Sequence, residues 1–495
     1  MHRFRLKSCA LALVICLLDF GCTHRVVKKL DPALTNADRE EIVGVTTNRG
    51  EDVKFDSPGG AVRNGVVSAR VRGADYTINL AEVNRLWVAR VETSRARTIG
   101  LVAGLAVGTI VTIAAVVVLT KQSCPFVYSW DGEKYAFDAE PYGGAITQGL
   151  ERDDYSELEH LRPDHGTYRL LMTNEVDETQ FTNLMELWVV DTPRDVRVVA
   201  DESGTLHSIR RLQAPIAAID RAGKDLLGWL RDKDQLIWET AAERKFDGAL
   251  RDEITLTFPK PQDARSARLA VNAGTGLWGS YMIKKMVELR GRTAPAWLES
   301  LKPQSEGLNA LHEWIAREDI YRLNVEVEEP DGWLTRGSVP PGGPLIVEDR
   351  VVQLDVSRVR GDKLRIRIRP PAGFWALNSF GVDYDQDRVP EVVRIAPAYA
   401  KTGAGRDIRD DLVSSDNRYY PMPSNTDRAE IRFKAPPEKP GLKRTIFLHS
   451  RGWYQLHLNT SREPDVEALD GIFNHRDGAA AFAAREYAAW KANQN

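Results

Sequence analysis

Three aspartates, Asp383, Asp385 and Asp387, alternate with other residues in one short stretch. Carboxylate oxygens are the ligands that hard cations prefer, and alternate acids in a loop are typical of calcium-binding loops. No glycine follows at a sharp turn, and the nearest later acid, Glu391, does not stand at the spacing of an EF-hand glutamate. The stretch therefore predicts Ca²⁺ as the candidate metal ligand, with a solvated hairpin tip as the alternative.

Other acids and histidines gather between residues 151 and 165. Glu151 precedes Asp153 and Asp154, and His160 and His165 follow. Two carboxylates across a sugar are what glycoside hydrolysis requires, and two imidazoles with an acid can hold a metal. Nucleophile elbows, P-loops, dinucleotide fingerprints and paired-histidine metal helices are absent from the sequence. We therefore assign no catalytic residue, and we expect a protein that is not an enzyme.

The composition excludes several classes of protein. The chain has 495 residues, of which 43% are apolar and 28% charged, so a packed core is expected. Its 67 basic and 70 acidic residues give a net charge of -3, which argues against a nucleic-acid partner. Four cysteines are too few for a disulfide scaffold or a multi-cysteine zinc module, and none follows Cys124.

The chain opens with a pattern that is typical of a secretory signal peptide. Basic residues precede an apolar run at 8–18, which is shorter than the about 20 residues that a membrane span needs. Gly21 and Cys22 end the segment. This ending resembles the lipobox of bacterial lipoproteins, although Asp19 stands where that family prefers leucine. The resemblance implies that Cys22 is the lipid anchor; the alternative is an ordinary signal peptide with an incidental cysteine.

A second apolar segment, residues 99–120, carries no charge. A helix of this length crosses a hydrocarbon core of about 30 Å. Gly100, Gly104 and Gly108 recur at every fourth position and so share one helix face, where small residues let two helices approach closely in lipid. We expect a glycine-zipper membrane helix that can also form homo-oligomers, with a buried soluble helix as the alternative.

The two apolar segments imply different topologies. A single span after an exported N-terminus would return the rest of the chain to the cytoplasm. However, arginines crowd the upstream flank of the span, which the positive-inside rule assigns to the cytoplasm. The zipper segment could belong to an envelope membrane where that rule has no force, the first segment could fail to export, or the C-terminal bulk could be cytoplasmic. We favour the first, with the bulk facing the outer membrane or periplasm.

Residues 40–98 show short apolar runs between turn signals, which is typical of a small antiparallel barrel. This pattern resembles the small SH3-like or Sm-like barrels that precede a membrane segment in uncharacterised bacterial envelope proteins.

An internal duplication spans the larger region. Motifs around Asp225, Phe258 and Trp278 recur in the same order around Asp407, Phe433 and Trp453. Self-similarity over so long an interval indicates two related domains rather than a solenoid. Both copies alternate apolar and polar residues, as in Lys-Leu-Arg-Ile-Arg-Ile-Arg at 363–369, so we expect two tandem β-sandwich modules. We also expect a helix over 217–231.

These patterns predict a mainly β chain with interposed helices. The expected units are a signal at 1–22, a linker at 23–39, a small barrel at 40–98, a membrane helix at 99–120, sandwich modules at 121–280 and 320–460, a helical bridge at 281–319, and a helical tail at 461–495. The leading hypothesis is a non-enzymatic, membrane-anchored protein of the bacterial cell envelope that binds a protein or glycan partner. The alternatives are an accessory glycan-active hydrolase and a self-assembling structural envelope protein.

Overall fold

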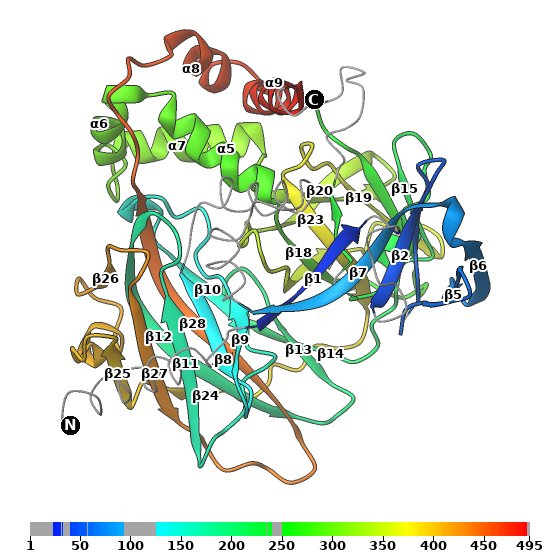
Figure 1. Ribbon diagram of the computed structural model, residues 1–495, viewed down its shortest axis with the longest axis horizontal. Helices are drawn as coiled ribbons and strands as arrows, with labels where there is room; N and C mark the ends of the chain where they lie inside the picture. Colours follow the sequence, from blue (N-terminus) through cyan, green and yellow to red (C-terminus); the bar gives the residue numbers. More distant parts are fainter. Residues whose placement is uncertain are drawn as a thin grey trace, which may run out of the picture.

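The computed structural model describes residues 23–30, 32, 40–56, 58–93, 125–234, 236–239 and 250–492. The expected class is confirmed, because the chain is mainly β, with several sheets and interposed helices (Figure 1). Within these ranges no helix is both long and apolar enough to span a bilayer. The predicted signal segment and the apolar segment 99–120 lie outside the described residues.

The N-terminal region has a core of its own, built on a separate three-stranded sheet and on strands that extend a nine-stranded sheet shared with the next region. Its strands are β1 (Thr23–Leu30), β2 (Glu41–Thr47), β3 (Asp52–Lys54), β4 (Ala61–Arg63), β5 (Val66–Val71), β6 (Ala74–Asn79) and β7 (Val83–Thr93). Ile42, Val67 and Leu86 pack in this core. β1 occupies part of the stretch that we expected to be linker, because it pairs with β7 and touches β9, and its polar sequence does not reveal these distant partners.

The rest of the β structure forms two sandwiches. Sandwich A packs the sheet β25-β27-β11-β8-β9 against β10-β28-β12-β24, with β26 also on β12. Its strands are β8 (Phe126–Trp130), β9 (Tyr135–Ala139), β10 (Arg152–Glu157), β11 (Thr167–Thr173), β12 (Glu178–Thr192), β24 (Val393–Ile395), β25 (Tyr399–Thr402), β26 (Tyr420–Met422), β27 (Arg428–Lys434) and β28 (Lys443–Leu456). The hairpin of β13 (Arg197–Ala200) and β14 (Leu206–Ile209) covers part of its outer face.

Sandwich B packs the sheet β15-β17-β22-β19-β20 against β16-β23-β18-β21. Its strands are β15 (Ala217–Asp220), β16 (Trp238–Glu239), β17 (Ile254–Pro259), β18 (Ser266–Thr275), β19 (Leu323–Glu329), β20 (Gly332–Val339), β21 (Glu348–Asp355), β22 (Lys363–Ile368) and β23 (Trp375–Asp383). The helix expected at 217–231 is wrong for most of its length, because β15, a turn at Gly223 and the single turn α4 (Leu227–Leu230) occupy it.

The two sandwiches share one plan, and each draws strands from both copies of the duplication. Matching the sheets position by position pairs β25, β27 and β28 of sandwich A with β15, β17 and β18 of sandwich B. β8 to β12 correspond in the same way to β19 to β23. Sandwich A therefore combines β8–β12 of copy one with β24–β28 of copy two, and sandwich B combines β19–β23 of copy two with β15–β18 of copy one. The strand pairing is exchanged between copies, which differs from the tandem order that we expected.

Local details support this correspondence. The Asp220 amide donates to the Lys224 carbonyl over 3.0 Å, and the Thr402 amide donates to the Arg406 carbonyl over the same distance. Gly223 adopts a φ of 80° in the first turn, a region that favours glycine. β12 and β23 each skip one residue in their pairing, and both skipped residues are asparagines, Asn183 and Asn378.

The remaining helices form a layer at one end of both sandwiches (Figure 1). They are α5 (Leu277–Glu288), α6 (Ala294–Glu299), α7 (Glu306–Glu318), α8 (Val466–Phe473) and α9 (Gly478–Ala492). Ser305 caps α7 by accepting from the Leu308 amide over 3.1 Å. The Trp314 indole donates to the Ile472 carbonyl over 3.1 Å and so ties α7 to α8.

A buried ion network joins the sandwiches. The Arg350 guanidinium on β21 donates to Glu348 over 2.6 Å and, across the joint, to Asp154 on β10 over 2.8 Å. All three side chains are buried, and Asp154 also accepts from the Tyr142 amide over 2.9 Å. Because buried carboxylates are costly without a cation, this contact fixes the two sandwiches in one arrangement.

We predict that Arg350→Met destabilises the protein by about 3–5 kcal/mol, because it leaves two buried carboxylates without their cation. Adding Asp154→Asn and Glu348→Gln should restore most of the loss. Denaturant unfolding followed by tryptophan fluorescence measures both changes. If the triple variant were as unstable as the single variant, the loss would come from packing and not from charge.

Candidate functional site

The outer face of the β10-β28-β12 sheet carries a continuous row of ionised side chains, here called the charged row. Its members are Glu151, Arg451, Asp153, His449 and Glu186. Arg451 donates to Glu151 over 3.2 Å and to Asp153 over 2.7 Å. The row assembles because Asp153 faces Arg451, and Glu186 faces His449, in the strand register. Copy one supplies the three acids, and copy two supplies the two bases.

His449 lies at the centre of this row between two carboxylates. Its Nε2 is 2.9 Å from Asp153 and its Nδ1 is 2.8 Å from Glu186, while its ring stacks on Tyr155 at 4.7 Å. Burial alone would lower the pKa of His449, but the two carboxylate hydrogen bonds raise it above its ordinary value. Both ring nitrogens face carboxylate oxygens, so a protonated His449 ring donates to Asp153 and Glu186 at once and links the two acids.

An aromatic cluster lies beside the charged row. Phe181 on β12 stacks on Trp453 on β28 with ring centroids 4.2 Å apart, and Tyr419 meets both rings edge-on. Asn183 follows Phe181 in sequence and donates to Glu151 over 3.2 Å, which links the cluster to the row. The three rings are half-buried, so part of each remains open to solvent.

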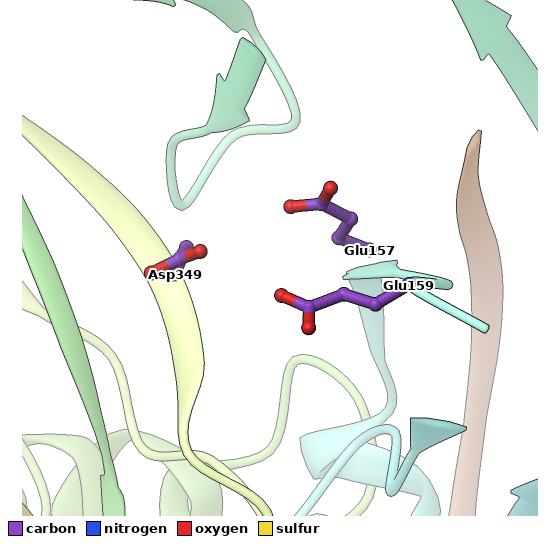
Figure 2. Close-up of side chains that lie close together, drawn as sticks. All are labelled: Glu157, Glu159 and Asp349. Carbon is purple, nitrogen blue, oxygen red and sulfur yellow. The ribbon is translucent and has the colours of Figure 1, made fainter. Parts of the chain in front are cut away.

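A second acid cluster, formed by Glu157, Glu159 and Asp349, lies at the joint between the sandwiches. Figure 2 shows their carboxylates turned toward one another, and one oxygen of each lies within 4.8 Å of the others. Lys233 contacts Glu159 and lies 2.7 Å from Asp349, which also binds Arg197. The protein's own cations therefore occupy the place that a metal ion would take. Burial, and then the Asp349 charge, raise the pKa of Glu157 to about 7.

The predicted calcium ligands are engaged elsewhere. Asp383 is buried and accepts from Arg268 over 3.2 Å, and Asp385 accepts from Arg211 over 3.0 Å. Asp387 lies 2.6 Å from Nδ1 of His207. Among the described residues, the ligand atoms of these three aspartates do not converge on one point. The geometry gives the calcium hypothesis no support, because each acid already balances a basic group of the protein.

The other predicted site residues fall into two groups. Cys22, Gly100, Gly104 and Gly108 lie outside the described residues. Glu151 and Asp153 lie together in the charged row, and Asp154 is buried beneath them in the joint. His160 and His165 take separate acidic partners, Asp138 and Asp164.

Sequence reasoning missed the importance of His449 and Arg451. The available signal was their spacing: His449 and Arg451 stand two residues apart in β28 and so share one face of the strand. Their acidic partners could not be identified, because the pairing of β28 with β10 joins distant parts of the chain.

Comparisons with known proteins assign no family. No family model and no curated protein matches the chain. Among solved structures, a β-porphyranase of glycoside hydrolase family 86 from Bacteroides plebeius is 7% identical, covering 49% of this chain and 37% of that one, with a TM-score of 0.17. A GH31 α-xylosidase from Xanthomonas citri is 9% identical, covering 86% of this chain and 35% of that one, with a TM-score of 0.15. The chain thus spans little more than a third of either enzyme. With such low TM-scores, neither similarity supports a conclusion about fold or function.

We predict that Glu157→Gln stabilises the protein increasingly as the pH rises from 5 to 8. An unfolded glutamate titrates near about 4.3, so a folded pKa of about 7 means that wild-type stability falls as the pH rises through this window. The gain at pH 8 is at most about 3 kcal/mol. Thermal unfolding of both proteins across this pH range measures it.

Glu159→Gln is the matched control, because it removes a carboxylate that binds Lys233. It should destabilise the protein and show no such gain at high pH. A benefit of Glu157→Gln that did not change with pH would contradict the assignment of a protonated Glu157.

Proposed function

We propose that the protein is a non-enzymatic, membrane-associated protein of the bacterial cell envelope that binds a glycan on the charged row and the aromatic cluster. The observation that carries this proposal is the pairing within the row. Three carboxylates and two basic groups lie side by side with 11–34% of each side chain exposed, and each is already held by an oppositely charged neighbour.

Such a surface suits a ligand that is rich in hydroxyl groups and has little charge. A hydroxyl donates to a carboxylate and accepts from a guanidinium, so it can bind at every position of the row without breaking the ion pairs. Phe181, Trp453 and Tyr419 add the apolar ring surface that the C–H faces of a sugar contact, and aromatic side chains dominate many binding surfaces. A charged ligand would instead compete with the internal pairs.

The geometry of the row does not favour hydrolysis. A glycosidase needs one carboxylic acid with a raised pKa next to a second, ionised carboxylate. Burial would raise the pKa of Asp153 and of Glu186, but the hydrogen bond from His449 lowers both below their ordinary values. Both are therefore ionised near neutral pH, so neither can serve as the protonated carboxylic acid.

One observation favours the alternative, a glycan-active hydrolase. Glu157 has the raised pKa of a general acid and lies close to Glu159 and Asp349. Lys233 and Arg197 neutralise those two neighbours, so we rank this function second. Release of reducing ends from a glycan, abolished by Glu157→Gln, would reverse the ranking.

The location in the envelope rests on the sequence. The signal-like start and Cys22 support attachment to membrane lipid, and the face of Gly100, Gly104 and Gly108 supports a homo-oligomer. A protein is the second class of ligand that this surface suits, because tryptophan, tyrosine and arginine are also enriched at the hot spots of protein interfaces.

We predict that Asp153→Asn and Trp453→Ala each weaken glycan binding at least about tenfold, which corresponds to the loss of one charged hydrogen bond or one ring contact. Binding to an array of neutral and acidic oligosaccharides measures the effect. Trp333→Ala is the control, because Trp333 is a half-buried tryptophan on sandwich B. If wild type bound none of the oligosaccharides, or if all three variants bound equally well, the proposal would fail.

We further predict that Cys22→Ser moves the protein from the membrane fraction to the soluble fraction, if the lipid anchor dominates attachment over the segment 99–120. Fractionation of cells with a C-terminal tag tests this. An unchanged membrane fraction would assign attachment to the second segment.

A further inference from the structure

A large cleft opens between sandwich A, the helical layer and the loop around Pro341. Its volume is about 630 Å³, within the range of about 300–1,000 Å³ that is usual for small-molecule sites. α5 and α7 form one wall, and the segment that leads into β10 forms the other. Three members of the charged row, Glu151, Asp153 and Arg451, also line the cleft, so the cleft adjoins the charged row.

The helical wall of the cleft is apolar, with aliphatic side chains from α5 and α7 beside the aromatic rings of Trp297, Trp314 and Phe473. Ile283, Met286 and Val287 repeat at the three- and four-residue spacing that places them on one face of α5. Leu311 and Ile315 do the same on α7. The half-buried Ile283 and Ile315 thus present branched alkyl groups to an open volume, where contact with water is unfavourable.

The opposite wall of the cleft is polar but charge-paired. Each of the four arginines that line the cleft binds a carboxylate of the protein. The pairs are Arg152 with Asp154, Arg322 with Glu202, Arg350 with Asp154, and Arg451 with Glu151 and Asp153. Each of these arginines already binds a carboxylate, so an anionic ligand would have to displace that carboxylate in order to bind. The carbonyl of Pro341 accepts from Arg152 over 3.1 Å, whereas the buried Nε atoms of Arg152 and Arg451 have no hydrogen-bond partner.

We propose that the cleft binds the hydrocarbon chain of an amphiphile whose head group is neutral or zwitterionic. The chain lies along the aliphatic wall of α5 and α7, and the head group lies at the charge-paired rim. An alkyl chain matches the aliphatic lining, and a head group without net charge leaves the arginine pairs intact. The cleft shares Glu151, Asp153 and Arg451 with the proposed glycan site, but the aromatic residues Phe181 and Trp453 of that site do not line it.

The test uses zwitterionic n-alkyl phosphocholines with octyl, decyl and dodecyl chains, kept below their micelle concentrations, and calorimetry on the full chain. Affinity should rise about fifteenfold for each two methylenes, which corresponds to about 0.8 kcal/mol per buried methylene, until the cleft is full. Fatty acids of equal chain length should bind more weakly. Affinity that did not depend on chain length would overturn the proposal.

Ile315→Glu places a carboxylate in the aliphatic wall and should weaken binding of the dodecyl compound at least tenfold. Ala310→Glu is the matched control, because Ala310 is exposed on the same helix and outside the cleft, and it should bind like wild type. Ile283→Ser provides a milder second variant if Ile315→Glu fails to fold. Equal loss in the Ile315 and Ala310 variants would contradict the assignment.

Trp453→Ala separates this site from the glycan site. It should leave alkyl binding unchanged even where it abolishes glycan binding, so either proposal can fail without the other. Loss of alkyl binding in this variant would place the amphiphile on the outer face of the sheet and overturn its assignment to the cleft.

Discussion

The rest of the structure depends on the buried guanidinium of Arg350. It lies between Glu348 of its own strand and Asp154 of the other sandwich. Burial raises the pKa of Glu348, because the charged carboxylate loses its contact with water. Asp154 is also next to Asp153 in sequence. The contact that joins the two sandwiches therefore also holds the strand β10, which carries Asp153 of the charged row and lines one wall of the cleft.

The second constraint is the exchange of strands between the two copies of the duplication. β10 and β12 of copy one bring the acids Glu151, Asp153 and Glu186, and β28 of copy two brings His449 and Arg451. Neither copy alone supplies both the acids and the bases of the charged row. In sandwich B the strand equivalent to β10 is β21, whose Asp349 faces Asn272 in the strand register. The equivalent position of sandwich B therefore has an asparagine in place of the base that pairs with Asp153 in sandwich A. The two sandwiches thus share a plan and differ in surface chemistry.

The sequence predicted individual strands, but it did not predict which strands pair with one another. Alternation placed the strand β22 correctly, because this signal is local. The pairing could not be predicted, since Phe258 and Phe433 are equivalent buried residues of their strands and fit either sandwich equally. The helix expected at 217–231 failed for a related reason: β15 gains its structure from pairing with β17. The aspartates at 383–387 looked like metal ligands because their partners, Arg268 and His207, lie far away in the sequence.

The central claim is that the two copies exchange strands to build the sites, and engineered disulfides test it most directly. In a chain whose native cysteines are replaced by serine, Leu171→Cys with Glu430→Cys should crosslink, because these residues are partners on β11 and β27. Leu171→Cys with Thr255→Cys should not, because Thr255 is the equivalent residue of the other copy and pairs on sandwich B. Mass spectrometry of non-reduced digests identifies the crosslink. Crosslinking of the second pair instead of the first would show tandem sandwiches and contradict the composite site.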